Sequence, residues 1–102
     1  MKEYKINLTH QFLEELDKVL YFFSYSYLTR RKIYNEVRNI VLSLSIFPER
    51  YSQIKEHEKF RTENIRKLSI DKFIIIYEVD NTKNEVYALH IFSEKQDYLN
   101  LL

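Results

Sequence analysis

The sequence predicts an α+β fold with an N-terminal strand, a two-helix hairpin and then three antiparallel strands that pack as a sheet against the helices. Apolar residues recur at three- and four-residue steps through the first half of the chain, as in amphipathic helices. The second half holds three segments rich in β-branched and aromatic residues. A length of 102 residues with 45% hydrophobic composition suits one domain over residues 1–102 and leaves little room for a second.

A short strand is expected at residues 2–8, where apolar and polar side chains alternate with the period of a half-buried strand. Thr9 follows directly and offers the N-cap of a helix over about residues 10–26. The apolar stripe of this helix consists of Phe12, Leu16, Val19, Leu20 and Phe23.

A second helix is expected over about residues 29–46, with Thr29 as its N-cap. It ends before Pro48, because proline disfavours helical geometry in the residue before it. The link between the two helices is short, which predicts an antiparallel hairpin. The buried face of the second helix consists of Ile33, Val37, Ile40, Val41 and Leu44.

The second half of the chain begins with a polar loop over residues 48–63, which shows no sustained apolar period. Residues 81–84 are turn-forming and join the last two strands as an antiparallel hairpin. The middle strand is apolar almost without alternation, which indicates a central strand covered on both faces. Residues 94–102 are expected to add a short helical tail. The three predicted strands are Asn64–Ile70, Phe73–Val79 and Glu85–Phe92.

The composition excludes several classes of site. A chain without Gly has no phosphate-binding G-x-x-x-x-G-K-S loop, no dinucleotide fingerprint and no G-x-S-x-G nucleophile elbow. A chain without Cys has no thiol chemistry, and its three histidines lack a metal-binding spacing, so neither metal nor cofactor is expected. The N-terminus lacks a secretory h-region, and no apolar run reaches the ~18 residues of a membrane span, so the expected location is the cytoplasm.

Positive charge is concentrated in the middle of the chain. Residues 29–72 carry eleven basic and six acidic side chains, whereas residues 73–102 carry two basic and five acidic ones. Such a distribution is typical of an anionic partner surface, although helix surfaces and loops also collect lysines and arginines as ordinary solvated groups. The basic side chains of residues 50–72 are suited to neutralise phosphates; they are Arg50, Lys55, Lys59, Arg61, Arg66, Lys67 and Lys72.

Arg66 is the most informative of the basic residues, because it stands inside a predicted strand. Strand alternation places it on the same face as Leu68 and Ile70, where it cannot be a simple solvated charge. An arginine on a partly apolar face needs a partner, which is either an internal carboxylate or a bound anion. The sequence leaves both open.

Two further groups of residues are candidates for binding or chemistry. Tyr21, Tyr25 and Tyr27 belong to an aromatic cluster that either fringes the core, stacks nucleobases or meets a protein partner. Lys95 and Tyr98 follow the last strand, where a rigid sheet would hold them. Lys95 can offset phosphate charge, and Tyr98 can exchange a proton or stack on a base.

The segment IRKLSIDKFIIIYEVDNTKNEVYALHIFSEKQDYLNLL resembles the C-terminal half of RelE/ParE superfamily toxins, and the N-terminal strand, helical hairpin and FPERY segment fit that family as well. The resemblance extends over about residues 3–99. It implies the toxin of a type II toxin–antitoxin pair, held inactive by a cognate antitoxin and without a small-molecule cofactor. The exposed tyrosines of the helical hairpin are then the expected antitoxin surface.

The resemblance implies one of two targets. RelE-like members cleave mRNA on the ribosome without a metal, and this activity would place catalytic roles on Arg66, Lys95 and Tyr98. The RNA-binding residues it implies are Lys55, Lys59, Arg61 and Lys67.

ParE-like members inhibit DNA gyrase instead. Ser93 in place of a frequent histidine, Asp97 and the weak net charge of +1 favour gyrase. A phosphate grip formed by Arg66, Lys67, Lys95 and Tyr98 favours mRNA cleavage, which is the first expectation, with gyrase inhibition as its alternative. A third possibility is an inactive chain that only binds an antitoxin.

Overall fold

The structure is a computed structural model and describes residues 2–23, 26–56 and 63–102. The predicted α+β fold is confirmed: a strand, two helices and three further strands follow one another in the expected order. The elements are β1 (Lys5–Leu8), α1 (His10–Phe23), α2 (Tyr27–Leu42), the 3₁₀ turns η1 (Ser43–Ser45) and η2 (Pro48–Arg50), β2 (Ile65–Ile70), β3 (Phe73–Asp80), β4 (Glu85–Ser93) and α3 (Tyr98–Leu101).

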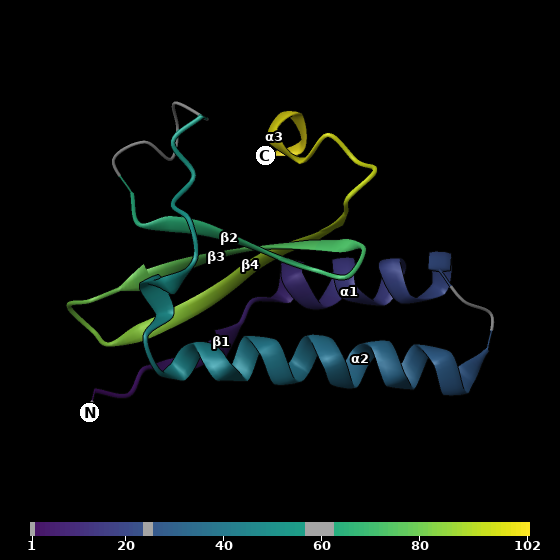
Figure 1. Ribbon diagram of the computed structural model, residues 1–102, viewed down its shortest axis with the longest axis horizontal. Coiled ribbons are helices and arrows are strands. Elements are labelled where there is room, and N and C mark those ends of the chain that lie inside the picture. Colours follow the sequence, from purple (N-terminus) through teal and green to yellow (C-terminus); the bar gives the residue numbers. More distant parts are fainter. Residues whose placement is uncertain (1, 24–25, 57–62) are drawn as a thin grey trace.

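The four strands form one sheet in the order β1-β4-β3-β2. The strands β2, β3 and β4 pair antiparallel, and β3 is central as its apolar sequence predicted. The strand β1 joins the far side of β4 in parallel, with Lys5 opposite Glu85 and Leu8 opposite Ala88. Figure 1 shows α1 and α2 as an antiparallel hairpin on one side of the sheet and α3 on the other.

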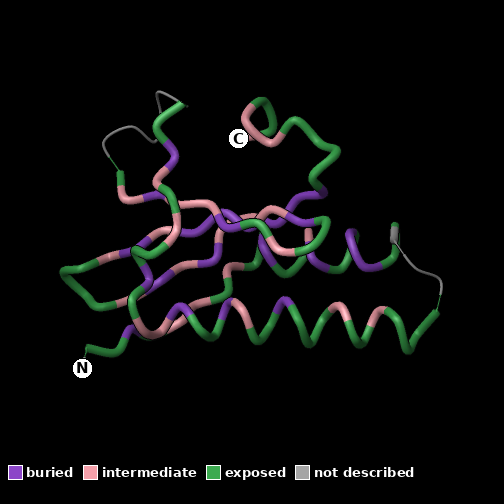
Figure 2. Tube along the Cα trace, in the orientation of Figure 1, coloured by how far each residue is buried: buried purple, intermediate pink, exposed green. Residues whose placement is uncertain are grey.

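The core is divided between these two sides. The larger apolar cluster lies between the helices and the sheet, and the smaller one lies under α3. Figure 2 shows most buried segments, in purple, towards the middle of the molecule. The larger cluster includes Phe12, Leu16, Val37, Val41, Leu44, Leu68, Ile75, Tyr77, Val86 and Ile91. The smaller one consists of Ile54, Ile65, Ile76 and Phe92, with Tyr98, Leu99 and Leu102 packed against it.

Of the two predicted helix N-caps, the first is confirmed and the second is wrong. Thr9 caps α1 as predicted, because its Oγ1 accepts a hydrogen bond from the Phe12 N–H at 3.2 Å. The predicted cap at Thr29 is wrong: α2 begins earlier, and the cap is Ser26, whose Oγ accepts from the Thr29 N–H at 3.5 Å. The α-helix also stops at Leu42, and the chain continues to residue 45 as a 3₁₀ turn. Because α-helix and 3₁₀ turn share similar apolar spacing over one turn, the sequence did not separate them.

The predicted polar loop over residues 48–63 contains structure in its described part. Ile54 is fully buried, and its N–H donates to the Ile65 carbonyl at 2.8 Å. Gln53 forms an isolated bridge with Arg66, so this segment covers part of the outer edge of β2. The expected helical tail is present as α3. None of the described helices has the length and apolar character needed to cross a bilayer.

Candidate functional site

Arg66 lies on the helix-facing side of β2, together with Leu68, and is engaged by internal partners. Its Nη2 is 3.2 Å from Oε2 of Glu49, and its Nη1 donates to the carbonyl oxygens of Tyr51 at 2.6 Å and Glu49 at 3.0 Å. Its Nε donates to Oδ1 of Asn64 at 2.9 Å. With a side chain only 15% exposed, Arg66 has the internal carboxylate that the sequence had left as one of two options.

Glu49 is the centre of a polar network around that arginine. Its carboxylate also accepts hydrogen bonds from the side-chain amides of Asn64 at 3.1 Å and Asn81 at 3.2 Å, and Asn81 accepts one from the Tyr4 hydroxyl. The Asn64 hydrogen bond is the main cause that lowers the pKa of Glu49, and the charge of Arg66 adds to it. The network therefore ties the residue before β1 to η2, β2 and the β3–β4 turn, which is a structural role.

Lys67 and Tyr98 meet on the opposite side of the sheet. Lys67 is the neighbour of Arg66 in β2 and so points to the other face. Its Nζ donates a hydrogen bond to the Tyr98 hydroxyl at 2.8 Å and lies 5.4 Å from the centre of the Tyr98 ring. That hydrogen bond is the main cause that raises the pKa of the Lys67 ammonium. A fixed cation beside a phenol is an arrangement that can hold an anion and assist a proton transfer.

Lys95 lies in a third place. It is exposed just beyond β4, and its backbone N–H donates to Oγ of the buried Ser93 at 3.2 Å. Among the described residues, no hydrogen bond or ion pair joins Lys95 to Arg66 or Tyr98, and Arg66 and Tyr98 lie on opposite faces of the sheet, so the structure does not gather the trio that the resemblance implied around one point. Lys95 instead lines a cavity of about 400 Å³ with Lys18, Val19, Phe22, Ser93 and Gln96.

The remaining predicted RNA-binding residues are only partly visible. Lys55 is exposed at the end of the described part of the loop, and its backbone N–H donates to a side-chain oxygen of Glu56. Lys59 and Arg61 lie outside the described residues. Of the two described members of this set, Lys55 and Lys67, only Lys67 forms a hydrogen bond with another predicted site residue, Tyr98.

The sequence did not identify the partner of His90, which is Glu15 of α1. Oε1 of Glu15 lies 3.0 Å from Nδ1 of His90 and accepts the backbone N–H of Ile91 at 3.3 Å. Because β1 ends at Leu8, this part of β4 has no strand on that side, and Glu15 accepts the hydrogen bond that a neighbouring strand would otherwise accept from the Ile91 N–H. The rings of His90 and Phe92 also stack, with their centres 5.3 Å apart. No local sequence pattern signals a contact between residues 75 positions apart.

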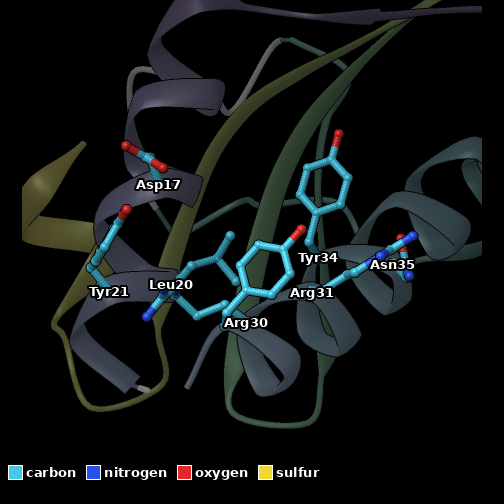
Figure 3. A pocket seen from close by; sticks show the side chains of 8 residues that line it. Asp17, Leu20, Tyr21, Arg30, Arg31, Tyr34 and Asn35 are labelled. Atoms are coloured by element: carbon cyan, nitrogen blue, oxygen red, sulfur yellow. The ribbon is translucent and has the colours of Figure 1, made fainter. Parts of the chain in front are cut away.

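The aromatic cluster of the helical hairpin forms an open cleft between α1 and α2. Tyr21 and Tyr27 are 59% and 65% exposed, and the guanidinium of Arg30 lies 4.6 Å from the centre of the Tyr21 ring. Tyr25 lies outside the described residues. Figure 3 shows acidic, aromatic and basic side chains from both helices around this cleft. The cleft measures about 450 Å³ and is lined by Asp17, Leu20, Tyr21, Tyr27, Arg30, Arg31, Tyr34 and Asn35.

No metal centre is evident in the part of the chain that the structure describes. Its histidine, aspartate and glutamate side chains do not gather in groups of three or more that could hold an ion. The acidic groups that do approach a cation or a histidine, such as Glu49 and Glu15, do so as single carboxylates.

Comparison with known proteins identifies both a family and a fold. Residues 6–98 match the family described as the ParE toxin of the type II toxin–antitoxin system parDE. In the RelBE2 toxin–antitoxin complex from Mycobacterium tuberculosis, one chain is similar at a TM-score of 0.68 and 16% identity, over 89% of this chain and 98% of that one. The free toxin RelE of E. coli, solved as a mutant, is similar at a TM-score of 0.61 and 14% identity, over 97% of this chain and 92% of that one. Among curated proteins, none matches.

Proposed function

This chain belongs to the ParE toxin family of type II toxin–antitoxin systems, and we propose that it arrests bacterial growth by inhibiting DNA gyrase in the cytoplasm. It is the toxin of its pair, and its partner is an antitoxin. The proposal concerns the target, for which the family offers two alternatives, gyrase and ribosome-bound mRNA.

The observation that carries the proposal is the engagement of Arg66. A metal-independent nuclease must surround one scissile phosphate with cationic and proton-transferring groups. Arg66 already donates to Glu49 and to two backbone carbonyls on the helix side, whereas Tyr98 lies on the other face of the sheet. The guanidinium that the nuclease requires is thus used to hold the fold, which supports a toxin that acts by binding a protein.

The charge of the chain supports the same target. Binding to RNA relies on neutralising many phosphates, and proteins that do so carry a strong positive charge. This chain has a formal net charge of only +1. Its exposed aromatic residues are, in contrast, the kind that protein interfaces favour.

Ribosome-dependent mRNA cleavage is the second candidate, and one observation favours it. The Lys67 ammonium and the Tyr98 hydroxyl form a pair at 2.8 Å on the sheet face away from the helical hairpin. Lys67 could neutralise a phosphate while Tyr98 exchanges the proton of an attacking or leaving oxygen. In this alternative Lys55 and Lys95 would supply further phosphate contacts, without Arg66.

One set of assays distinguishes the candidates. The purified toxin is added to DNA gyrase in a supercoiling assay and to programmed ribosomes in an mRNA cleavage assay, and Tyr98→Phe is tested beside it. We expect dose-dependent loss of supercoiling and intact mRNA. Cleaved mRNA that is lost in Tyr98→Phe would establish the nuclease instead. Normal growth at verified expression of the toxin alone would leave only antitoxin binding.

The cleft between α1 and α2 is the proposed antitoxin surface. Its exposed tyrosines offer an apolar surface to an amphipathic segment, and Arg30 and Arg31 can meet acidic side chains. We expect Tyr27→Ala to weaken the antitoxin complex at least tenfold in calorimetry without lowering the melting temperature of the toxin. Arg38→Ala, which lies on α2 outside this cleft, is the matched control. An equal loss in both variants would move the interface elsewhere.

A further inference from the structure

Phe47 occupies a backbone conformation that its residue type disfavours. Three non-glycine residues in the described part of the chain have positive φ: Phe47 at 51°, Asp71 at 51° and Asn84 at 55°. Asp71 and Asn84 lie in the two β-hairpin turns, and aspartate and asparagine tolerate the left-handed region. A bulky aromatic residue does not, so local conformational preference gives no reason for a phenylalanine at position 47.

The surrounding chain holds Phe47 in this conformation from both sides. The carbonyl of the following residue, Pro48, accepts a hydrogen bond from the buried Tyr77 hydroxyl at 2.6 Å. The N–H of Arg50 donates to the Phe47 carbonyl at 3.2 Å, and the Arg50 guanidinium donates to the preceding carbonyl of Ile46 at 2.7 Å. The backbone around Phe47 is therefore fixed before any partner arrives.

This rigid backbone presents the phenylalanine ring to solvent. Phe47 is 68% exposed although the buried Leu44 lies only three residues earlier. The ring stands at a cavity of about 550 Å³ that Tyr4 and Pro48 line with apolar surface. An exposed, pre-positioned aromatic ring beside a cavity is the typical anchor of a protein interface, because little conformational entropy is lost when it is buried.

The charge around the cavity defines the partner. Lys2 and Arg50 line it as cations. Glu49 also lines it, but its carboxylate is engaged by Arg66 and two asparagines. The Arg50 guanidinium is also held, but by the neutral carbonyls of Ser43 and Ile46 and the Ser43 hydroxyl, so its charge is not neutralised. The net charge at the rim is consequently positive, which fits a partner segment that places a carboxylate next to an apolar side chain.

The cavity is separate from the proposed antitoxin surface. Tyr27 begins α2 and Phe47 follows its far end, and a helix of 16 residues is about 24 Å long. Figure 1 shows these two ends of α2 on opposite sides of the molecule. A second protein can therefore contact Phe47 without using the cleft of Tyr21 and Tyr27.

We propose that Phe47 and the cavity lined by Lys2, Tyr4, Pro48 and Arg50 form the docking point for the target enzyme, through an acidic and apolar segment of DNA gyrase. The inference rests on gyrase as the proposed target. It assigns the strained phenylalanine to target recognition and the opposite end of α2 to the antitoxin.

The test uses two variants of the full chain. Phe47→Asn removes the ring and suits a positive φ, whereas Phe47→Tyr keeps the ring in place. We expect Phe47→Asn to melt at the same temperature as the parent or a few degrees higher, and to bind the antitoxin unchanged. It should need at least ten times more toxin for half-inhibition of gyrase supercoiling, and Phe47→Tyr should stay within about twofold of the parent.

The outcomes separate the inference from the target it rests on. If the parent inhibits gyrase and Phe47→Asn inhibits it equally well, the docking point is wrong and gyrase remains the target. If the parent leaves gyrase active, the proposed target is wrong, and with it the gyrase partner of this cavity. A Phe47→Asn variant that loses antitoxin affinity in step with gyrase inhibition would also overturn the inference, because the ring would then serve both partners.

Discussion

Arg66 and Lys67 are neighbours in one strand, yet they belong to two different environments. Arg66 faces the helices and donates to a carboxylate, an amide and two carbonyls, whereas Lys67 faces the side of α3 and contacts one tyrosine. The helix side also carries the larger apolar cluster. The difference teaches that a basic residue in the sheet of such a toxin is not by itself a ligand site. The face of the sheet on which it lies decides whether partners within the protein already engage its charge.

The largest effect is expected on the helix side of the sheet. Val41→Asp places an unpaired carboxylate where a side chain is 1% exposed, and should cost about 4 kcal/mol or more and unfold the chain. Arg38→Asp, exposed on the same helix, should change stability by less than about 1 kcal/mol. Circular dichroism melts measure both. Similar losses in the two variants would contradict the burial of this helix face.

A matched pair in β3 compares the two faces directly. Ile75 and Ile76 are both fully buried, but Ile75 belongs to the larger cluster and Ile76 to the smaller one under α3. We expect Ile75→Ala to lower the free energy of unfolding by about 4 kcal/mol and Ile76→Ala by about 2 kcal/mol. The second loss is smaller because α3 is a single short helix that can move to fill part of the cavity left by the side chain. Urea unfolding gives both values, and equal costs would show that α3 is packed as firmly as the hairpin.

Arg66 and Lys67 provide the next comparison. Arg66→Ala leaves two carbonyls and an amide without their donor, and should lower the free energy of unfolding by about 1–3 kcal/mol. Lys67→Ala removes one hydrogen bond to a partly exposed tyrosine and should cost less than about 1 kcal/mol. A neutral Arg66→Ala in thermal and urea melts would mean that the Glu49 network does not hold the fold.

The smallest effect is a pH dependence from Glu49. Its pKa in the folded chain lies below the ordinary value of 4.5, so the unfolded chain binds this proton more readily. The stabilisation is therefore complete above about pH 4.5 and disappears as the pH falls through the lower folded pKa. Glu49→Gln should flatten this part of the acid unfolding curve. An acid limb of unchanged steepness would assign the loss to other carboxyl groups.

The order and type of the elements could be predicted because each depends on local patterns. The apolar stripe of α1, the unbroken apolar run of β3 and the turn before β4 each occupy one continuous segment. The exact start of a helix was harder to predict where two nearby residues could both act as the N-cap. Ser26 and Thr29 are both ordinary N-cap residues, and only the folded backbone decides that Ser26 accepts the hydrogen bond.

The partners of the site residues could not be predicted, because they come from distant segments. Glu49 lies 17 residues before Arg66, and Tyr98 lies 31 residues after Lys67. Strand alternation gave the correct face for Arg66, together with Leu68, but it carries no information about which carboxylate approaches that face. The strain at Phe47 is equally hidden, because positive φ in a phenylalanine follows from the hydrogen bonds of its surroundings.

The parallel pairing of β1 with β4 has a consequence for the order of folding. Lys5 pairs with Glu85, so β1 has no strand to pair with until β4 has been made. Contacts between such distant segments form late, since the intervening chain must lose its freedom first. A nascent chain that stops before Glu85 therefore leaves β1 without its pairing strand, although Tyr4, Glu49 and Asn81 have already been made.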